Sequence, residues 1–232
     1  DEIGRVLVAE NIDADFIKSG FLSLARTQAQ LQRVKAMVAG SRQFGLPDQW
    51  RMLSAAESSR RVGAEGILGG LYTPHCALVH PGKLVRGLAQ RVEQLGATIY
   101  EQSPALSIEP HQIKTPEGVI RAQTIVRATE AFTCQQPDQQ RSVIPLYSLV
   151  LATEPLTPPQ RAATGLEQRL AFNDMRHLRI YGQMTASGRL IFGGRGAPYH
   201  FGSRISAQDD LTDNVHSKIF DTLTEFFPQL RD

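Results

Sequence analysis

Apolar residues recur at helical spacing between Pro81 and Leu95, and this stretch is the clearest element of the chain. The stripe along the predicted helix consists of Leu84, Val85, Leu88, Ala89, Val92 and Leu95. Pro81 suits a first helical turn, because its missing N–H would be unpaired there, and Gly96 suits the end of a helix. The apolar run at 97–100 then predicts a strand, so the pattern indicates a helix followed by a strand.

The remaining pattern predicts further helices and many short strands. Helices are expected over 1–10, from Thr27 to a break at 45–48, from Ser54 to about residue 62, and from Asp213 to Pro228. Thr27, Ser54 and Asp213 are helix-capping residue types, and Glu57 stands at capping-box spacing from Ser54. Strands are expected over 21–24, 106–108, 112–114, 119–120, 124–129, 143–153, 177–182 and 189–192, the last two as a hairpin.

The strands outnumber those of a simple alternating βαβ chain, and the pattern therefore favours an α+β fold. The expected architecture is a largely antiparallel mixed sheet flanked by helices. Along the chain we expect a helical N-terminal part over 1–68, a helix-strand unit with a β-meander over 69–142, and a sheet with a C-terminal helix over 143–232. These parts are expected to form one compact, discontinuous unit.

Composition narrows the class of function. Hydrophobic residues make up 41% of the 232 residues and charged residues 21%, which predicts a folded chain with a core. The 25 basic and 23 acidic residues leave a net charge of +2 without a basic run, so no nucleic-acid or membrane-surface partner is expected. No apolar run approaches the roughly 18 residues of a membrane-spanning helix. Two cysteines and no signal peptide predict a reduced, cytoplasmic protein, and the missing initial methionine suggests an excised or processed chain.

Two histidines and a cysteine precede the predicted helix at Pro81. His75, Cys76 and His80 could contribute to a zinc site, since imidazole and thiolate bind zinc well, but a fourth ligand at suitable spacing is missing. A cysteine nucleophile with a histidine base is another alternative. Packing or loop hydrogen bonding explains the same residues without chemistry. We favour this interpretation and predict no metal site.

The run Gly193-Gly194-Arg195-Gly196 follows the second strand of the predicted hairpin. It is no dinucleotide fingerprint, because G-x-G-x-x-G opens a helix, whereas Pro198 follows closely here. One interpretation is a tight turn. The other is a backbone that approaches a planar ring or an anionic group, with Arg195 as a fork for a carboxylate.

Three tyrosines, Tyr147, Tyr181 and Tyr199, lie on or beside predicted strands and have polar neighbours. In a sheet that faces a pocket they could hold a small amine or acid. Half-buried tyrosines are also common in sheets, and that interpretation needs no ligand.

Several segments are familiar in combination. They are a Gly-Gly-aromatic turn at 69–72, Pro-x-x-Leu at 81–84, Leu-Gly-Ala at 95–97, Ala-Thr-Glu at 128–130, Pro-Leu-Tyr at 145–147, Thr-Glu-Pro-Leu at 153–156 and Arg-Leu-Ile-Phe-Gly-Gly-Arg at 189–195. Together they resemble the D-amino-acid oxidase superfamily, which includes glycine oxidases and gamma-glutamylputrescine oxidoreductases. The resemblance implies a FAD-dependent oxidoreductase that oxidises a small amine or amino acid by hydride transfer to flavin. It also implies that the chain is mostly the substrate domain, with part of the FAD domain.

The resemblance further implies two groups of site residues. The substrate-binding residues expected from it are Tyr147, Tyr181, Arg195 and Tyr199. The residues expected near the flavin are Thr129, Glu130, Gly193 and Gly194. Glu130 stands where the family has a glycine.

Two features of the family are missing from the chain. It has no G-x-G-x-x-G segment, whose helix N-terminus holds the pyrophosphate, and it stops at Asp232 without the family's closing segment. We therefore interpret the chain as the central fragment of a flavoenzyme, inactive by itself and unable to retain FAD alone. The alternatives are a non-catalytic ligand-binding or scaffold module, which Glu130 would suit, and a metal-binding enzyme that uses His75, Cys76 and His80. The identity of the substrate and of the electron acceptor stays open.

Overall fold

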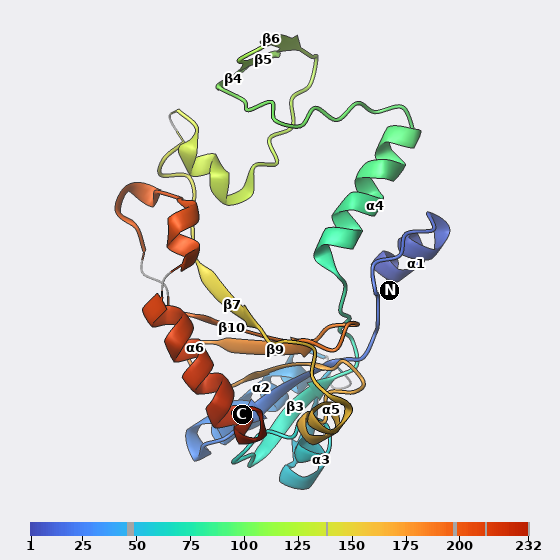
Figure 1. The fold of residues 1–232 in the computed structure, drawn as a ribbon, viewed down its shortest axis with the longest axis vertical. Coiled ribbons are helices and arrows are strands. Elements are labelled where there is room, and N and C mark those ends of the chain that lie inside the picture. Colours follow the sequence, from blue (N-terminus) through green and yellow to red (C-terminus); the bar gives the residue numbers. More distant parts are fainter. Residues whose placement is uncertain (46–48, 138, 197–198, 212, 232) are drawn as a thin grey trace. The chain divides into compact units, whose positions relative to one another are not determined.

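The computed structural model describes residues 1–45, 49–137, 139–196, 199–211 and 213–231, without the side chains of Asp210 and Asp213 (Figure 1). Internal contacts divide the chain into two discontinuous units. Unit 1 comprises residues 1–88, 148–196 and 213–232, and unit 2 comprises residues 89–147 and 197–212. The three consecutive parts expected over 1–68, 69–142 and 143–232 stay a prediction.

Unit 1 is built on a mixed sheet whose seven described strands have the order β2-β3-β1-β8-β9-β10-β7. The strands are β1 (Phe21–Ala25), β2 (Arg51–Ser54), β3 (Gly69–Thr73), β7 (Ser148–Ala152), β8 (Ala171–Asp174), β9 (Ile180–Met184) and β10 (Leu190–Arg195). Strands β1 and β8 run parallel, and the other described pairs are antiparallel. The predicted α+β fold with a largely antiparallel mixed sheet is confirmed, as is the hairpin of β9 and β10.

The helices begin and end largely where local signals predict. They are α1 (Glu2–Ala9), α2 (Gln28–Gln43), α3 (Ala55–Ser59), α4 (Pro81–Gln94), α5 (Pro158–Thr164) and α6 (Asp213–Phe226), followed by the short 3-10 segment η4 (Pro228–Leu230). The hydroxyl of Thr27 accepts a hydrogen bond from the Gln30 N–H, and Ser54 and Glu57 form a capping box. The division between the units falls inside α4, after Leu88.

Two predictions about helix ends lie outside the described residues. These are the helix break at 46–48 and capping by the side chain of Asp213. Helix α5 was not predicted, although Thr157 and Gln160 form the same capping box that identified α3. Within the described residues, no helix combines the length and the apolar composition needed to cross a bilayer.

The side of the sheet that faces α6 carries the aromatic core of unit 1. Helix α6 contacts β7 and β10, and Figure 1 shows it beside these strands. Val215, Ile219, Leu223 and Phe226 of α6 are all buried. Four fully buried rings meet here, those of Phe172, Phe192, Phe226 and Phe227, with neighbouring centroids 5.8 to 6.3 Å apart. Aromatic pairs at this spacing stabilise a core beyond the area that they bury.

The other side of the sheet is covered by α2 at its β1–β3 end. Val34 of α2 belongs to a buried cluster with Ala25, Leu71 and Met175. Because β7 and β10 lie at the opposite end of the strand order, this cluster is remote from them. The two sides of the sheet are thus packed differently.

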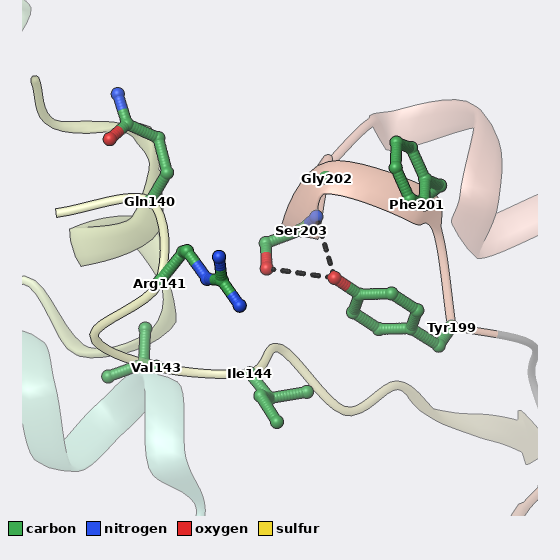
Figure 2. A pocket seen from close by; sticks show the side chains of 8 residues that line it. All are labelled: Gln140, Arg141, Val143, Ile144, Tyr199, Phe201, Gly202 and Ser203. Atoms are coloured by element: carbon green, nitrogen blue, oxygen red, sulfur yellow. Dashed lines mark hydrogen bonds between the residues drawn. The ribbon is translucent and has the colours of Figure 1, made fainter. Parts of the chain in front are cut away.

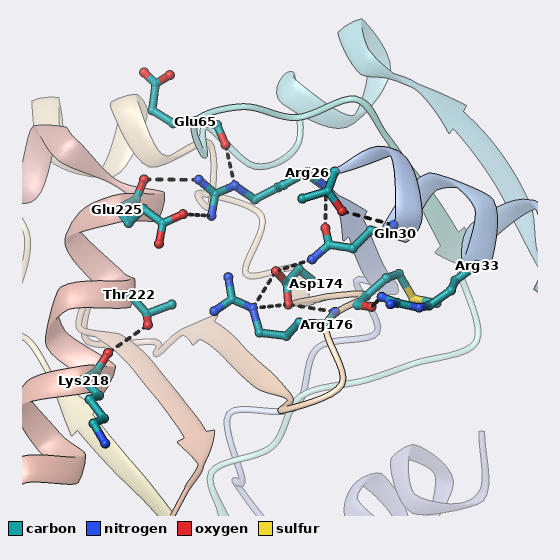
Figure 3. A network of polar contacts seen from close by, with 11 residues as sticks. Arg26, Gln30, Arg33, Glu65, Asp174, Arg176, Lys218, Thr222 and Glu225 are labelled. Atoms are coloured by element: carbon teal, nitrogen blue, oxygen red, sulfur yellow. Dashed lines mark hydrogen bonds and ion pairs between the residues drawn. The ribbon is translucent and has the colours of Figure 1, made fainter.

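A buried ion pair lies at the end of β8 (Figure 3). The Asp174 side chain is fully buried, and its two carboxylate oxygens accept hydrogen bonds from Arg176 Nε at 2.8 and 2.9 Å. Gln30 of α2 donates to the same carboxylate at 3.1 Å. Nearby, Arg26 at the end of β1 pairs with Glu225 of α6 at 2.9 Å. This network connects the sheet to helices on both of its sides.

Unit 2 contains the predicted β-meander, formed by β4 (Ser107–Glu109), β5 (Gln112–Thr115) and β6 (Gly118–Arg121). Its 3-10 segments are η1 (Glu130–Gln135), η2 (Phe201–Ser203) and η3 (Ala207–Leu211). The strands predicted at 97–100 and 124–129 are wrong, because neither stretch joins a described strand. Tyr100 is 71% exposed and Val126 82% exposed, so these apolar runs do not pack into a sheet.

Other predictions near the sheet are corrected as well. Gly69 and Gly70 lie inside β3, so the predicted Gly-Gly-aromatic turn is wrong. A Cβ on Gly70 would be 2.7 Å from Leu22 Cδ1 and 2.9 Å from Ser58 Oγ, so the close packing of β1 and α3 requires glycine there. Strand β7 is shorter than the predicted 143–153, and β2 and β8 were not predicted.

Candidate functional site

The pairing of β9 with β10 places Tyr181 opposite Gly193. The tyrosine ring lies over the glycine, since a Cβ on Gly193 would be 2.5 Å from Tyr181 Cζ. The Tyr181 hydroxyl lies 3.0 Å from the hydroxyl of Ser148 at the start of β7. The tight-turn interpretation of the glycine pair is wrong, because Gly193 and Gly194 both lie within β10. The close approach that requires glycine at 193 is that of the Tyr181 ring.

The same register extends this pair into a row across the sheet. Ser23 of β1 pairs with Asn173 of β8, Asn173 pairs with Tyr181, and Tyr181 pairs with Gly193. Residues paired across strands point to the same face of a sheet. The row therefore places three polar side chains on one face, and we call it the polar row.

Asn173 is the unusual member of the polar row. Its side chain is 7% exposed, and its Oδ1 atom has no hydrogen-bond partner among the described residues. A buried acceptor without a partner costs about 1–3 kcal/mol, so such groups are rare in folded proteins. The sequence offered no signal for Asn173, because its environment depends on strand pairing.

A cavity of about 290 Å³ adjoins this face near the turn between β9 and β10. Gln183 and Ile191, a cross-strand pair two residues along from Tyr181 and Gly193, line it. Arg169 also lines the cavity, and its Nη2 donates to the backbone carbonyl of Asp15 at 2.9 Å. The remaining lining is mostly apolar, which suits a small molecule with an apolar part. This cavity was not predicted.

Arg195 pairs with Ser148 of β7, and by strand alternation its side chain leaves the sheet on the same face as Gly193 and Tyr181. It ends β10 and lines a separate cavity of about 170 Å³ beside α6. Gly194 lines the same cavity, and a Cβ on it would be 3.7 Å from Ile219 Cγ1 of α6. Successive residues of a strand point to opposite faces. Gly193 and Gly194 therefore serve different sides of the sheet, the polar row on one side and α6 on the other.

Tyr147 lies in unit 2 and is held by residues of that unit. Its hydroxyl donates to Asp209 Oδ2 at 3.5 Å and accepts from the Ser206 N–H at 3.4 Å. Its ring meets the ring of His200 edge-on, with centroids 5.5 Å apart. His200 Nε2 is itself 3.4 Å from Asp209 Oδ1. These contacts tie Tyr147 to η3 and the segment before it.

Tyr199 lines a cavity of about 520 Å³ in unit 2 (Figure 2). Its hydroxyl accepts a hydrogen bond from the Ser203 N–H at 3.1 Å and lies 3.2 Å from Ser203 Oγ. Ser203 has a φ of +57°, an uncommon conformation for a residue other than glycine. Figure 2 shows Arg141 pointing toward these two hydroxyls from the opposite wall. Neither Arg141 nor Ser203 was predicted as a site residue.

Thr129 and Glu130, predicted near the flavin, lie in unit 2 at the start of η1. Thr129 Oγ1 is 2.7 Å from Thr133 Oγ1, and the Ala131 N–H donates to the Glu130 carboxylate. Glu130 has a φ of +44°, in the left-handed region that costs a residue with a Cβ about 1–2 kcal/mol. The glycine of the family is replaced here, but the backbone keeps a conformation that favours glycine.

His75, Cys76 and His80 do not gather into a site. Among the described residues, no three His, Cys, Asp or Glu side chains are placed to hold a metal ion, so the metal alternative gains no support. His80 Nδ1 accepts a hydrogen bond from the Lys83 N–H at the start of α4. Burial raises the pKa of the Cys76 thiol, which opposes the thiolate form that a nucleophile needs.

Comparison with known proteins agrees with this fold. The family model described as "FAD dependent oxidoreductase" (DAO) matches residues 1–232. A probable oxidoreductase OrdL of Haemophilus influenzae is 26% identical over 203 residues, which cover 83% of this chain and 46% of the relative. A glycine oxidase of Geobacillus kaustophilus is 26% identical over 204 residues, which cover 84% of this chain and 52% of the relative. The crystal structure of glycine oxidase from Bacillus cereus matches with a TM-score of 0.75 at 17% identity, covering 99% of this chain and 61% of that chain.

The chain thus spans about half the length of these two sequence relatives. The resemblance expected from its glycine, proline and tyrosine motifs is confirmed, because the family model matches from residue 1 to residue 232. FAD is the cofactor of that family and oxidation its chemistry. The chain belongs to the DAO family of FAD-dependent oxidoreductases.

Proposed function

We propose that this chain supplies the substrate-facing sheet of an enzyme that oxidises a small amine or amino acid with FAD. Membership of the family supports the cofactor and the reaction type. The glycine oxidase among the relatives supports the class of substrate. The observation that carries the proposal is the polar row, in which Asn173 and Tyr181 place polar groups on the sheet face away from α6.

The residues of this face fit a bound flavin and its substrate. The Oδ1 atom of Asn173 is a buried acceptor without a partner among the described residues, as expected where a ligand completes the hydrogen bonding. Bound FAD would supply the hydride acceptor for the C–H bond next to the substrate nitrogen. Tyr181, whose hydroxyl is held by Ser148, would orient the polar end of the substrate. The cavity lined by Arg169 and Gln183 would exclude water from the apolar part of the substrate.

The other site residues keep their predicted roles as part of this proposal. The substrate-binding residues are Tyr147, Arg195 and Tyr199. The residues near the flavin are Thr129, Glu130, Gly193 and Gly194.

A Tyr181→Phe variant of the complete enzyme, the polypeptide that includes this chain and a FAD-binding segment, tests the proposal. Without the hydroxyl, flavin reduction by glycine or another small amine should slow about tenfold, because one orienting hydrogen bond is lost. The flavin content should stay unchanged. The matched control is Tyr100→Phe, which removes the hydroxyl of an exposed tyrosine in unit 2. Equal rates for wild type and Tyr181→Phe would contradict the role of the polar row.

We further propose that the isolated chain does not retain FAD and is inactive by itself, because it has no G-x-G-x-x-G segment. The test is a visible absorption spectrum of the purified chain after incubation with excess FAD and desalting. A colourless product is expected. Retained flavin would contradict the proposal and would place a FAD site within these 232 residues.

One observation favours a second function, a non-catalytic ligand-binding or scaffold module. The Glu130 carboxylate stands where the family has glycine, so it adds bulk and charge at a position predicted to lie near the flavin. If this second function holds, the complete protein should bind FAD, but no small amine tested should reduce the flavin. Flavin reduction by any of these amines would rule it out.

A further inference from the structure

The cavity of about 520 Å³ in unit 2 combines one cationic side chain with two hydroxyl groups (Figure 2). Arg141 lines one wall, and Tyr199 and Ser203 line the wall opposite. All the described residues that line the cavity belong to unit 2, and no carboxylate is among them. Their side chains therefore carry one positive charge, and the volume of the cavity suits one small molecule.

A tight turn presents Arg141 to the cavity. The Ser142 N–H donates to the Gln139 carbonyl at 3.0 Å, and the Ser142 hydroxyl donates to Gln139 Oε1 at 2.8 Å. Arg141 is one of the two central residues of this turn, and its side chain points toward the two hydroxyls in Figure 2. Among the described residues its guanidinium has no hydrogen-bond or ion-pair partner. Its donors are therefore available to a ligand.

The two hydroxyls opposite Arg141 have one proton to spare. The Tyr199 hydroxyl accepts from the Ser203 N–H at 3.1 Å and lies 3.2 Å from Ser203 Oγ. One hydroxyl donates to the other, and the second hydroxyl proton has no acceptor within the described part of the chain. Ser203 is buried and keeps its φ of +57° while its carbonyl accepts from Cys134 Sγ at 3.2 Å, and such strained residues often serve ligand sites. Together with the guanidinium, these donors favour an anionic group.

Apolar side chains line the rest of the cavity. They are Val143 and Ile144, which follow Arg141 along the same wall, and Phe201. Ile144 is 69% exposed and Phe201 is 98% exposed, so much apolar surface is left in contact with water. A ligand with an apolar body would cover part of this surface, and the burial of apolar area favours binding. The cavity therefore suits a ligand with one charged end and one apolar end.

We propose that this cavity binds a small carboxylate that carries an aromatic or aliphatic body. The guanidinium of Arg141 binds the two carboxylate oxygens, and the spare hydroxyl proton of Tyr199 and Ser203 is donated to one of them. One guanidinium matches the single negative charge of a carboxylate, whereas a phosphate monoester carries a charge closer to two. The inference extends the role proposed for Tyr199 but requires neither FAD nor amine oxidation. Its failure would therefore leave the proposed oxidation standing.

A nitrogen-15 NMR titration of the purified chain with sodium benzoate tests the site at constant ionic strength. Sodium acetate keeps the charge without the apolar body, and benzyl alcohol keeps the ring without the charge. We expect benzoate to give saturable shifts of the amide signals of Ile144, Gly202 and Ser203, with a dissociation constant at least about tenfold below those of the two reference compounds. Equal affinity for acetate or for benzyl alcohol would overturn the proposal, as would benzoate shifts confined to residues outside the cavity.

The variant Arg141→Gln should raise the dissociation constant of benzoate at least about tenfold, because the charge-assisted contact is lost. Arg141→Lys keeps the charge without the planar fork and should weaken binding less. The matched control is Arg121→Gln, which removes the same charge from an exposed position on β6 of the same unit. Its dissociation constant should equal that of the wild type. The proposal is overturned if Arg121→Gln weakens binding as much as Arg141→Gln, or if neither variant changes it.

Discussion

The region under α6 and the polar row on the opposite face of the unit 1 sheet differ in how completely their polar groups are hydrogen-bonded. Under α6, four phenylalanine rings are fully buried against one another, and both oxygens of the Asp174 carboxylate accept hydrogen bonds. On the other side, the polar row contains Asn173, whose Oδ1 has no partner among the described residues. Tyr181 of the same row is 37% exposed. The first side is arranged as expected for stability, and the second as expected for a surface that meets a ligand.

This comparison predicts that substitutions on the two sides act on different quantities. Changes under α6 should lower the free energy of unfolding. Changes in the polar row should alter activity while leaving stability equal or higher, because functional groups are often kept at a cost in stability. The following experiments test the contrast.

The largest loss of folding stability is expected for Phe172→Ala. Removing this fully buried ring from the four-ring cluster should lower the free energy of unfolding by about 4 kcal/mol, through lost burial and a residual cavity. Urea unfolding of the purified chain measures the change. Phe44→Ala is the matched control, since Phe44 is 78% exposed and its loss should cost less than about 0.5 kcal/mol. If both variants lowered the free energy of unfolding by similar amounts, the distinction between core and surface would not hold.

A smaller loss of folding stability is expected for Asp174→Asn. The change leaves the Arg176 guanidinium beside a neutral amide and should lower the free energy of unfolding by about 3 kcal/mol, because the pair is largely buried. Urea unfolding again gives the value. The control is Glu154→Gln, which breaks an exposed pair with Arg189 and should change stability by less than about 1 kcal/mol. If Asp174→Asn costs no more than Glu154→Gln, the network in Figure 3 does not stabilise the junction of the sheet with α2 and α6.

A substitution in the polar row should raise the free energy of unfolding rather than lower it. Asn173→Leu replaces a buried, unpaired acceptor by an apolar side chain of similar size and should raise the free energy of unfolding by about 1 kcal/mol. In the complete enzyme the same change should lower kcat/KM for a small amine about tenfold. Asn214→Leu, an exposed position on α6, serves as the control and should leave both quantities nearly unchanged. A destabilised Asn173→Leu variant would show that the amide is needed for folding.

The smallest effect is expected at the surface of α3, where Glu57 closes the capping box. The N–H and hydroxyl of Ser54 bind its carboxylate and hold the pKa of Glu57 below its ordinary value of 4.5. A carboxyl whose pKa is lowered by folding stabilises the protein above the ordinary pKa, and this contribution is lost as the pH falls through the lower folded value. Wild type should therefore melt slightly above Glu57→Gln at pH 7, and the difference in Tm should shrink as the pH falls below 4.5 toward the lower pKa of the folded state. A difference in Tm that stays constant as the pH is lowered would show that the charge of Glu57 does not contribute.

Local chemistry allowed the helices and turns to be predicted from the sequence. Thr27 and Ser54 cap helices because their hydroxyls satisfy N–H groups within three residues, and Gly96 follows α4 with a φ of +96°. The hairpin of β9 and β10 follows from two alternating segments around a turn. The capping box at Thr157 could have been found by the same rule. The family motifs, in addition, allowed the cofactor and the reaction type to be predicted.

The sequence by itself thus determined the capped helices, the meander, the hairpin, the α+β class and membership of the DAO family. Tertiary structure alone decided the polar row, because Ser23, Asn173 and Tyr181 are neighbours only through strand pairing. It also separated Gly193 from Gly194, since successive residues of β10 point to opposite sides of the sheet, one toward Tyr181 and the other toward α6. Residues 124–129 are apolar enough for a strand, but a strand also needs a neighbour to pair with. The physical reason is the same in each case: capping acts over a few residues, whereas pairing, burial and the sharing of a cavity depend on segments far apart in the chain.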